Sequence, residues 1–196
     1  MSALLHRREV VATLLKDRGD LLVVAGLGAP SWDITAAGDH DLNFPMWGAM
    51  GGAAVMGLGL ALAQPQRSVL VVTGDGEMLM GLGALATIAV EQPKNLSVVV
   101  LDNAHYGETG MQRTHTGYGV DLAGMAAAAG FAQALRVKTQ AEVEKLRDLA
   151  HAGEGPLFAA IAIDPEKLPL VLPPREGSLI KNRFRLALLG PRAAHD

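Results

Sequence analysis

Two short apolar runs, each followed by polar residues, constrain the fold of this chain more than any other feature. The run 68–73 is followed by Gly74-Asp75-Gly76, and the run 96–101 is followed by Asp102-Asn103. Each run has the length and the valine and leucine content of a buried strand. Because the carboxyl ends of neighbouring parallel strands lie at the same edge of a sheet, we expect Asp75 and Asn103 to face one crevice.

The residue types at this edge suit a hard cation bound to a diphosphate. Mg²⁺ prefers about six oxygen ligands and commonly takes one or two carboxylates together with phosphate oxygens and water. The carboxylate of Asp75 and the amide oxygen of Asn103 fit that role. Gly74 and Gly76 let backbone N–H groups approach a phosphate, and a helix that opens at Glu77 favours an anion at its N-terminus. We therefore predict a metal-bridged diphosphate.

The rest of the sequence alternates between strand and helix patterns, which predicts an α/β fold with a three-layer, doubly wound, mostly parallel sheet. Thr139 to Glu142 form a capping box that opens one of the helices. Strands are expected at 21–25, 69–73, 96–101, 132–137 and 157–163, with a short extended piece near 41–44. Helices are expected at 7–18, 50–63, 79–91, 122–129 and 139–151, that at 50–63 being buried.

Length and composition predict one domain. The 196 residues provide for a single three-layer domain over 1–196, in which 165–196 form a Pro-rich linker and a terminal helix. A second domain of similar size does not fit. A net charge of −3 with 19% charged residues offers no basic surface for nucleic acid. Without cysteine the chain has no disulfides, zinc–thiolate sites or thiol nucleophiles.

No segment of the sequence predicts export or membrane insertion. In Met1–Arg8 the charges follow too short an apolar stretch for a signal peptide. The apolar stretch 50–63 is shorter than a membrane span and rich in glycine. We therefore expect a cytoplasmic protein.

The spacing of the two polar motifs resembles that of the thiamine diphosphate (ThDP)-binding domain of the decarboxylase superfamily. In that family Gly-Asp-Gly is followed after about two dozen residues by two asparagines, and here Asp102 replaces the first of them. The family's metal ligands are the aspartate, the second asparagine and the backbone carbonyl two residues further on. The resemblance places these ligands at Asp75, Asn103 and His105, and only the side chain of Asn103 has to match.

The resemblance covers about residues 10–190 and is most specific to the sulfopyruvate and phosphonopyruvate decarboxylases. It is carried by 47–53, 58–63 and Pro65, by 103–112, and by 180–185. It implies that Tyr106 and Gly107 also bind the cofactor. It further implies that Met50 props the cofactor into its bent conformation and that the carbonyl of Gly48 receives the aminopyrimidine amino group.

What the family supplies on a second domain is missing from this sequence. ThDP enzymes use a glutamate at the pyrimidine N1′, and this superfamily carries it on a separate pyrimidine-binding domain. The resemblance thus implies the β subunit of a heteromer, α2β2 or larger, whose α subunit brings the glutamate. Such an enzyme would use ThDP and Mg²⁺ to remove CO₂ from a small 2-oxo acid and release an aldehyde.

Single residues allow other interpretations. Glu77 is either a solvated carboxylate in a first helical turn or a member of the site. His40, His105 and His115 lie near the expected crevice, and the resemblance makes His115 the candidate for substrate contact or proton transfer. Gly26-Leu27-Gly28 could begin a dinucleotide fingerprint, but the third glycine and the later acidic residue are missing.

Two other functions remain beside the decarboxylase subunit. One is a non-catalytic partner with the ThDP fold, although such a scaffold would not need Asp75, Asn103 and their glycines. The other is a subunit of a ThDP-dependent ligase, lyase or oxidoreductase. Zero cysteines argue against iron–sulfur clusters of the kind that such oxidoreductases use.

Overall fold

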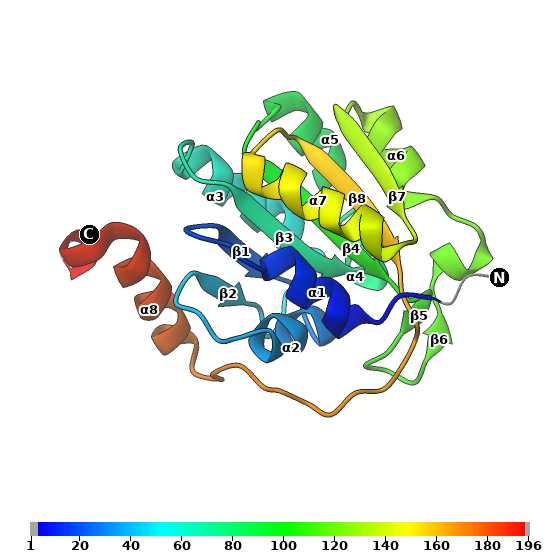
Figure 1. Ribbon diagram of the computed structural model, residues 1–196, viewed down its shortest axis with the longest axis horizontal. Coiled ribbons are helices and arrows are strands. Elements are labelled where there is room, and N and C mark those ends of the chain that lie inside the picture. Colours follow the sequence, from blue (N-terminus) through cyan, green and yellow to red (C-terminus); the bar gives the residue numbers. More distant parts are fainter. Residues whose placement is uncertain (1–3, 195–196) are drawn as a thin grey trace.

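Six parallel strands form the sheet of the protein, whose computed structural model describes residues 4–194 (Figure 1). The strand order is β2-β1-β3-β4-β8-β7. Met1–Ala3, the start of the segment tested for a signal peptide, and the last two residues of the expected tail lie outside the described residues. The strands are β1 Leu22–Ala25, β2 Asn43–Pro45, β3 Val69–Gly74, β4 Leu96–Asp102, β7 Gln133–Val137 and β8 Leu157–Ala162.

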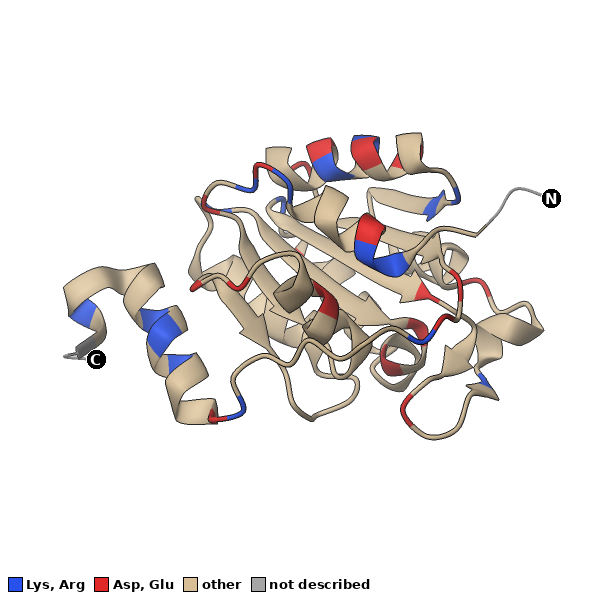
Figure 2. Ribbon diagram, turned by 60° about the horizontal axis from the view of Figure 1, so that its bottom comes forward, with Lys and Arg blue, Asp and Glu red and all other residues tan. Residues whose placement is uncertain are grey.

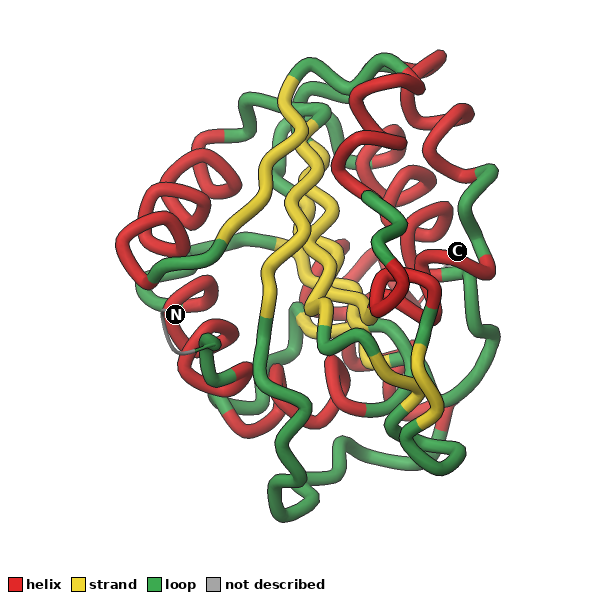
Figure 3. The backbone as a smooth tube through the Cα atoms, turned by 90° about the vertical axis from the view of Figure 1, so that its right-hand side faces the viewer, coloured by secondary structure: helices red, strands yellow, loops and turns green. Residues whose placement is uncertain are grey.

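Helices cover both faces of this sheet (Figure 3), so the predicted fold class is confirmed. One face packs on a core that includes α1 Arg7–Leu15 and α7 Gln140–Ala152, with α2 Ala29–Ala36 on the same side. The other face carries α3 Ala53–Ala63, α5 Ala84–Glu91 and α6 Leu122–Ala129. Leu70 and Val72 of β3 face the first core, and Val69 and Val71 face the second. Strands buried on both faces explain the continuous apolar runs of the sequence.

The two helical layers differ in their outer surfaces. Figure 2 shows acidic and basic residues along α7, whereas α3 has no charged residue. The expectation of a buried helix at 50–63 is wrong in two respects. The helix begins at Ala53, and its outer face exposes Val55 and Leu62 by 48% and 50%. An apolar helix face left open to solvent is typical of an interface.

The helix expected at 79–91 is interrupted. The chain forms α4 Asp75–Met80, a turn at 81–83, and then α5. Gly81 lies so close to Gly51 that a Cβ on Gly81 would overlap the carbonyl oxygen of Gly51. This close approach of two backbones requires glycine and prevents one straight helix.

Other elements differ from the predictions or were not predicted. α1 ends at Leu15 instead of residue 18, and helix α2 was not expected at all. The hairpin of β5 His105–Tyr106 and β6 Gln112–Arg113 was also missed. The short 3-10 helices η1 His115–Tyr118 and η2 Gly190–Ala194 complete the fold.

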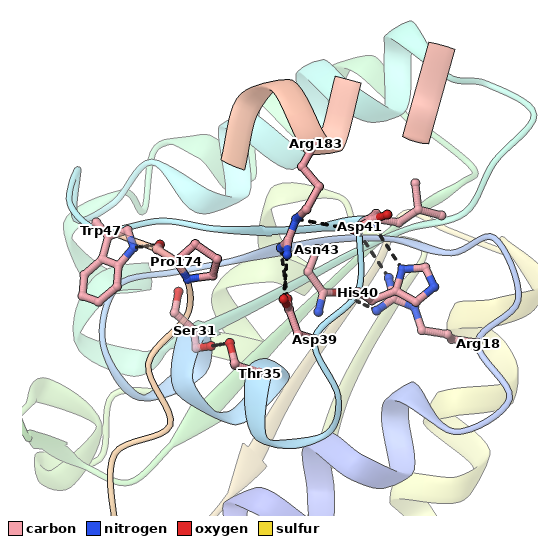
Figure 4. A network of polar contacts seen from close by, with 11 residues as sticks. Arg18, Ser31, Thr35, Asp39, His40, Asp41, Asn43, Trp47, Pro174 and Arg183 are labelled. Atoms are coloured by element: carbon pink, nitrogen blue, oxygen red, sulfur yellow. Dashed lines mark hydrogen bonds and ion pairs between the residues drawn. The ribbon is translucent and has the colours of Figure 1, made fainter. Parts of the chain in front are cut away.

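The C-terminal segment returns across the molecule to the β2 edge of the sheet. Residues 164–176 have no regular structure, and α8 Gly177–Leu189 follows them. Trp47 Nε1 donates to the carbonyl of Pro174 at 2.7 Å, and Arg183 pairs with both carboxylate oxygens of Asp39 (Figure 4). Phe184 meets Phe44 edge to face with ring centroids 5.5 Å apart. The terminal segment is therefore anchored on the sheet.

Within residues 4–194, none of the helices is long and apolar enough to cross a membrane. The cellular location stays a prediction of the sequence.

Candidate functional site

A cavity of about 350 Å³ opens at the carboxyl ends of β3 and β4. It lies beside the point where the order of the strands in the sheet reverses, because β2 lies on one side of β1 and β3 lies on the other. This is where open parallel sheets bind ligands. The predicted residues that line the cavity are Met50, Gly74, Asp75, Gly76, Glu77, Asn103, His105, Tyr106 and Gly107.

Asp75 is the most deeply buried polar group of this cavity. It begins α4 directly after β3 and is only 2% exposed. Its Oδ2 accepts a hydrogen bond from the hydroxyl of Thr114, and the hydroxyl oxygen of Thr116 lies 3.1 Å from the same Oδ2. Burial raises the pKa of Asp75, and the nearby charge of Asp102 adds to that effect. A cation bound beside this carboxylate would therefore stabilise its charged form.

The turn after β4 carries the other expected ligands. Asn103 Oδ1 accepts from the backbone N–H of His105 at 2.9 Å, and Asp102 Oδ1 accepts from that of Ala104 at 3.0 Å. Ala104 has φ +60°, a left-handed conformation that costs energy for alanine. The two side-chain hydrogen bonds hold this tight turn, which directs the chain from β4 into the hairpin.

The oxygen atoms around Asp75 provide only part of the ligands that Mg²⁺ needs. Thr114 and Thr116 supply two hydroxyl protons, yet their oxygens make four close contacts, with Asp75 Oδ2, with Asp102 Oδ1 and with each other. Two protons cannot serve all four contacts, so the two carboxylates keep uncompensated negative charge, which suits a nearby hard cation. Among the described residues, however, no three His, Cys, Asp or Glu side chains gather closely enough to hold a metal by themselves. Further ligands would have to come from phosphate and water.

Glu77 is a buried clamp and not a solvated carboxylate. It is 4% exposed, and its oxygens accept from the N–H of Leu27 at 3.0 Å and of Ala53 at 3.4 Å. A Cβ on Gly26 would overlap its carboxylate, so Gly26 leaves room for this side chain. Burial raises the pKa of Glu77. The clamp ties the end of β1 and the start of α3 to α4.

Two other contacts shape the cavity. The ring of Tyr106 lies against Gly76, where a Cβ would overlap it. Met50 and Met80 line the cavity although they are 39% and 63% exposed. They form an apolar wall at an open rim. Gly48, by contrast, is exposed and does not line the cavity.

The histidines are not gathered at the cavity. His105 lines it, with Nδ1 2.7 Å from the carbonyl oxygen of Asn103. His115 is exposed on η1 and outside the lining, so a contact with substrate would have to be made from the rim. His40 lies near the β2 edge of the sheet, where its Nδ1 accepts from the N–H of Leu42 (Figure 4).

Comparisons with known proteins identify the family. The model of the C-terminal TPP-binding domain of thiamine pyrophosphate enzymes matches residues 32–161. The chain belongs to the thiamine pyrophosphate enzyme family. Thiamine pyrophosphate is another name for ThDP, so the recognition from the sequence is confirmed.

Individual relatives of this TPP-binding chain are decarboxylases. It is 39% identical over 162 residues to the sulfopyruvate decarboxylase subunit beta of Methanothermobacter thermautotrophicus, covering 83% of this chain and 84% of that one. It is also 39% identical over 175 residues to the phosphonopyruvate decarboxylase of Streptomyces viridochromogenes, covering 89% of this chain but 44% of that protein. The solved benzoylformate decarboxylase of Polynucleobacter necessarius shares the fold, with a TM-score of 0.66, 22% identity, and coverage of 85% of this chain and 34% of that one.

Several residues of this TPP-binding chain could not be found from its motifs. Thr114 and Thr116 reach the site only because the hairpin returns the chain to Asp75. Arg7, 5% exposed, lines the cavity and pairs with the buried Asp33 at 3.0 Å. Glu108 lies beside it in the lining, and burial raises its pKa. A surface carboxylate and an arginine at the start of a helix have no distinctive signal in the sequence.

Proposed function

We propose that this chain is the diphosphate- and Mg²⁺-binding β subunit of a ThDP-dependent decarboxylase of the sulfopyruvate and phosphonopyruvate type. The observation that carries the proposal is the cavity in which Asp75, Asn103 and His105 lie together beside Gly74 and Gly76. The names of relatives at 35–40% identity supply the reaction class. The substrate is a small 2-oxo acid.

Asp75, Asn103 and the backbone carbonyl of His105 would hold Mg²⁺, which in turn neutralises the diphosphate. The N-terminus of α4 contributes less than the sequence indicated, since the helix has only six residues and Asp75 and Glu77 lie in its first turn. The N-terminus of α2 is better suited, because its first turn has no acidic residue and Ala29 lines the cavity. Metal and cofactor should therefore bind interdependently.

When bound, ThDP supplies the electron sink that decarboxylation of a 2-oxo acid requires. The protein supplies position and surroundings. Met50 and Met80 provide an apolar wall at the open rim, which would exclude water only once a partner chain covers it. An apolar environment favours loss of a carboxylate whose charge is being dispersed. Tyr106 and Gly76 would set the depth at which the diphosphate is held.

A second chain is needed to complete the site. The described acidic residues that line the cavity are Asp75, Glu77 and Glu108. Asp75 is assigned to the metal, Glu77 is engaged by two backbone N–H groups, and Glu108 is an exposed residue of the loop between β5 and β6. We therefore assign the activating glutamate to a pyrimidine-binding α subunit, in an α2β2 or larger assembly. The exposed apolar rim at Met50 and Met80 and the exposed apolar face of α3 are the surfaces it would cover.

Reconstitution tests the proposal. Decarboxylation of sulfopyruvate, phosphonopyruvate and other 2-oxo acids is measured with this chain alone, with a pyrimidine-domain partner, and with the partner and Asp75→Ala. Activity should require the partner and should be absent from the variant, which should remain folded but lose ThDP in calorimetry. Full turnover by the isolated chain would refute the two-chain assignment. Tight ThDP binding without turnover in any mixture would favour a non-catalytic partner.

A further inference from the structure

We propose that Thr114 and Thr116 are positioning residues of the metal site. Their hydroxyls fix the carboxylates of Asp75 and Asp102, so that Asp75 presents its other oxygen, Oδ1, to Mg²⁺. This inference rests on the proposed function, since it concerns the metal that would bridge the diphosphate.

The contacts themselves are direct. Thr114, which has no exposed surface, donates its hydroxyl proton to Oδ2 of Asp75. The hydroxyl oxygen of Thr116 lies 2.7 Å from Oδ1 of Asp102 and 3.1 Å from Oδ2 of Asp75. Each threonine has one hydroxyl proton and can therefore donate to only one carboxylate. The shorter of the two Thr116 contacts indicates that Thr116 donates to Asp102. Both contacts to Asp75 use Oδ2, which leaves Oδ1 for the metal.

The carboxylate of Asp102 is the reason that a bridging hydroxyl is needed beside Asp75. A second carboxylate beside Asp75 increases the attraction for a cation but also repels its neighbour. The hydroxyl of Thr116 lies between the two and offsets that repulsion by hydrogen bonding. An asparagine in this position would not need a bridging donor.

The backbone keeps the hydroxyls in place. The N–H of Thr114 donates to the carbonyl of Ala104 at 2.9 Å, and Arg113 pairs with His105 in the hairpin. The segment that carries the threonines is thus joined to the turn that carries Asp102 and Asn103. Partners that orient metal ligands typically change metal affinity by about 10- to 100-fold when they are removed.

A purely structural role makes a different prediction. If the hydroxyls only satisfy buried carboxylates, their loss lowers the melting temperature and leaves the metal requirement unchanged. If they position Asp75, the Mg²⁺ concentration for half-maximal ThDP binding rises as well. Thr→Val substitution separates the two roles, because valine keeps the shape of threonine and removes the hydroxyl.

The test titrates ThDP into the purified full-length chain, alone and together with a pyrimidine-domain partner, by calorimetry over a series of Mg²⁺ concentrations. Thr114→Val and Thr116→Val should each raise the Mg²⁺ requirement by about tenfold or more, whereas Thr114→Ser should restore it. Thr35→Val is the matched control, since Thr35 donates to the carbonyl of Ser31 at 2.8 Å on α2 and is not in the cavity lining. Melting temperatures are recorded for every variant.

The outcomes separate this inference from the function on which it rests. A wild-type chain that, even with the partner present, binds ThDP independently of Mg²⁺ or not at all contradicts the proposed function. Wild-type binding that requires Mg²⁺, with the same requirement in Thr114→Val and Thr116→Val, overturns the positioning role alone. If Thr114→Val does not fold, Thr116→Val still decides the question, because it removes a hydroxyl that contacts both carboxylates.

Discussion

Removal of the Glu77 clamp should destabilise the fold by a predictable amount. Glu77→Ala leaves the N–H groups of Leu27 and Ala53 without their acceptor. The N–H of Ala53 is buried and costs about 1–3 kcal/mol when it is unsatisfied. The N–H of Leu27 is only part-buried, so its cost lies toward the lower end of that range, and about 2–6 kcal/mol is an upper range for the two. The substitution also removes a carboxylate whose raised pKa shows that burial opposes its charge. We therefore expect a net loss in the lower half of the range, about 2–4 kcal/mol.

This loss is large relative to the total stability of a domain, which is about 5–15 kcal/mol. For a chain of this size, 1 kcal/mol shifts the melting temperature by about 2–4 °C, so the transition should fall by roughly 4–16 °C. Glu77→Gln keeps the volume and one acceptor oxygen, but it turns an NH₂ toward the second N–H. Its loss should lie between those of the alanine variant and the wild type.

Urea unfolding followed by circular dichroism measures the effect, with Glu91→Ala as the control. Glu91 is an exposed carboxylate at the end of α5, and its removal should change stability by less than about 0.5 kcal/mol. A Glu77→Ala variant as stable as the control, or a glutamine variant less stable than the alanine variant, would show that the clamp does not carry this energy.

Two further predictions concern the rim of the cavity and a distant histidine. Met50→Ala should lower turnover of the reconstituted enzyme while it costs less stability than the about 2–5 kcal/mol of a core methionine, because Met50 is 39% exposed; a large fall in melting temperature with unchanged turnover would contradict this. Burial lowers the pKa of His40, whose Nδ1 accepts from the N–H of Leu42 at 3.0 Å. The unfolded chain therefore binds this proton more readily, and stability should fall as the pH drops below about 6.5. His40→Asn should flatten that part of the melting profile between pH 7.5 and 5, and an unchanged slope would exclude His40 as the cause.

The parts of the fold that follow from local pattern were predictable, and those that depend on tertiary contacts were not. The runs before Asp75 and Asp102 are buried on both faces, so their pattern identified two neighbouring strands. The break at 81–83 depends on the approach of Gly81 to Gly51, and a helix pattern does not reveal a neighbour thirty residues away. α2 was missed because its residues lack a regular apolar stripe.

The candidate site divides in the same way. Asp75 and Asn103 were placed together because parallel neighbours end at one edge of the sheet, and the structure brings them to one cavity. Thr114 reaches Asp75 across thirty-nine residues through a hairpin too short to give a strand pattern. The roles of Asp75, Asn103 and His115 in binding and catalysis stay predictions.

Anomalous diffraction from Mn²⁺ tests the central claim most directly. The chain and its partner are crystallised with ThDP and Mn²⁺ in place of Mg²⁺, and the metal is located from its anomalous signal. We predict one peak within about 2.0–2.3 Å of Oδ1 of Asp75, the side-chain oxygen of Asn103 and the carbonyl oxygen of His105, with two diphosphate oxygens and one water completing a shell of about six ligands. ThDP bound with the metal elsewhere, or bound outside this cavity, would contradict the account.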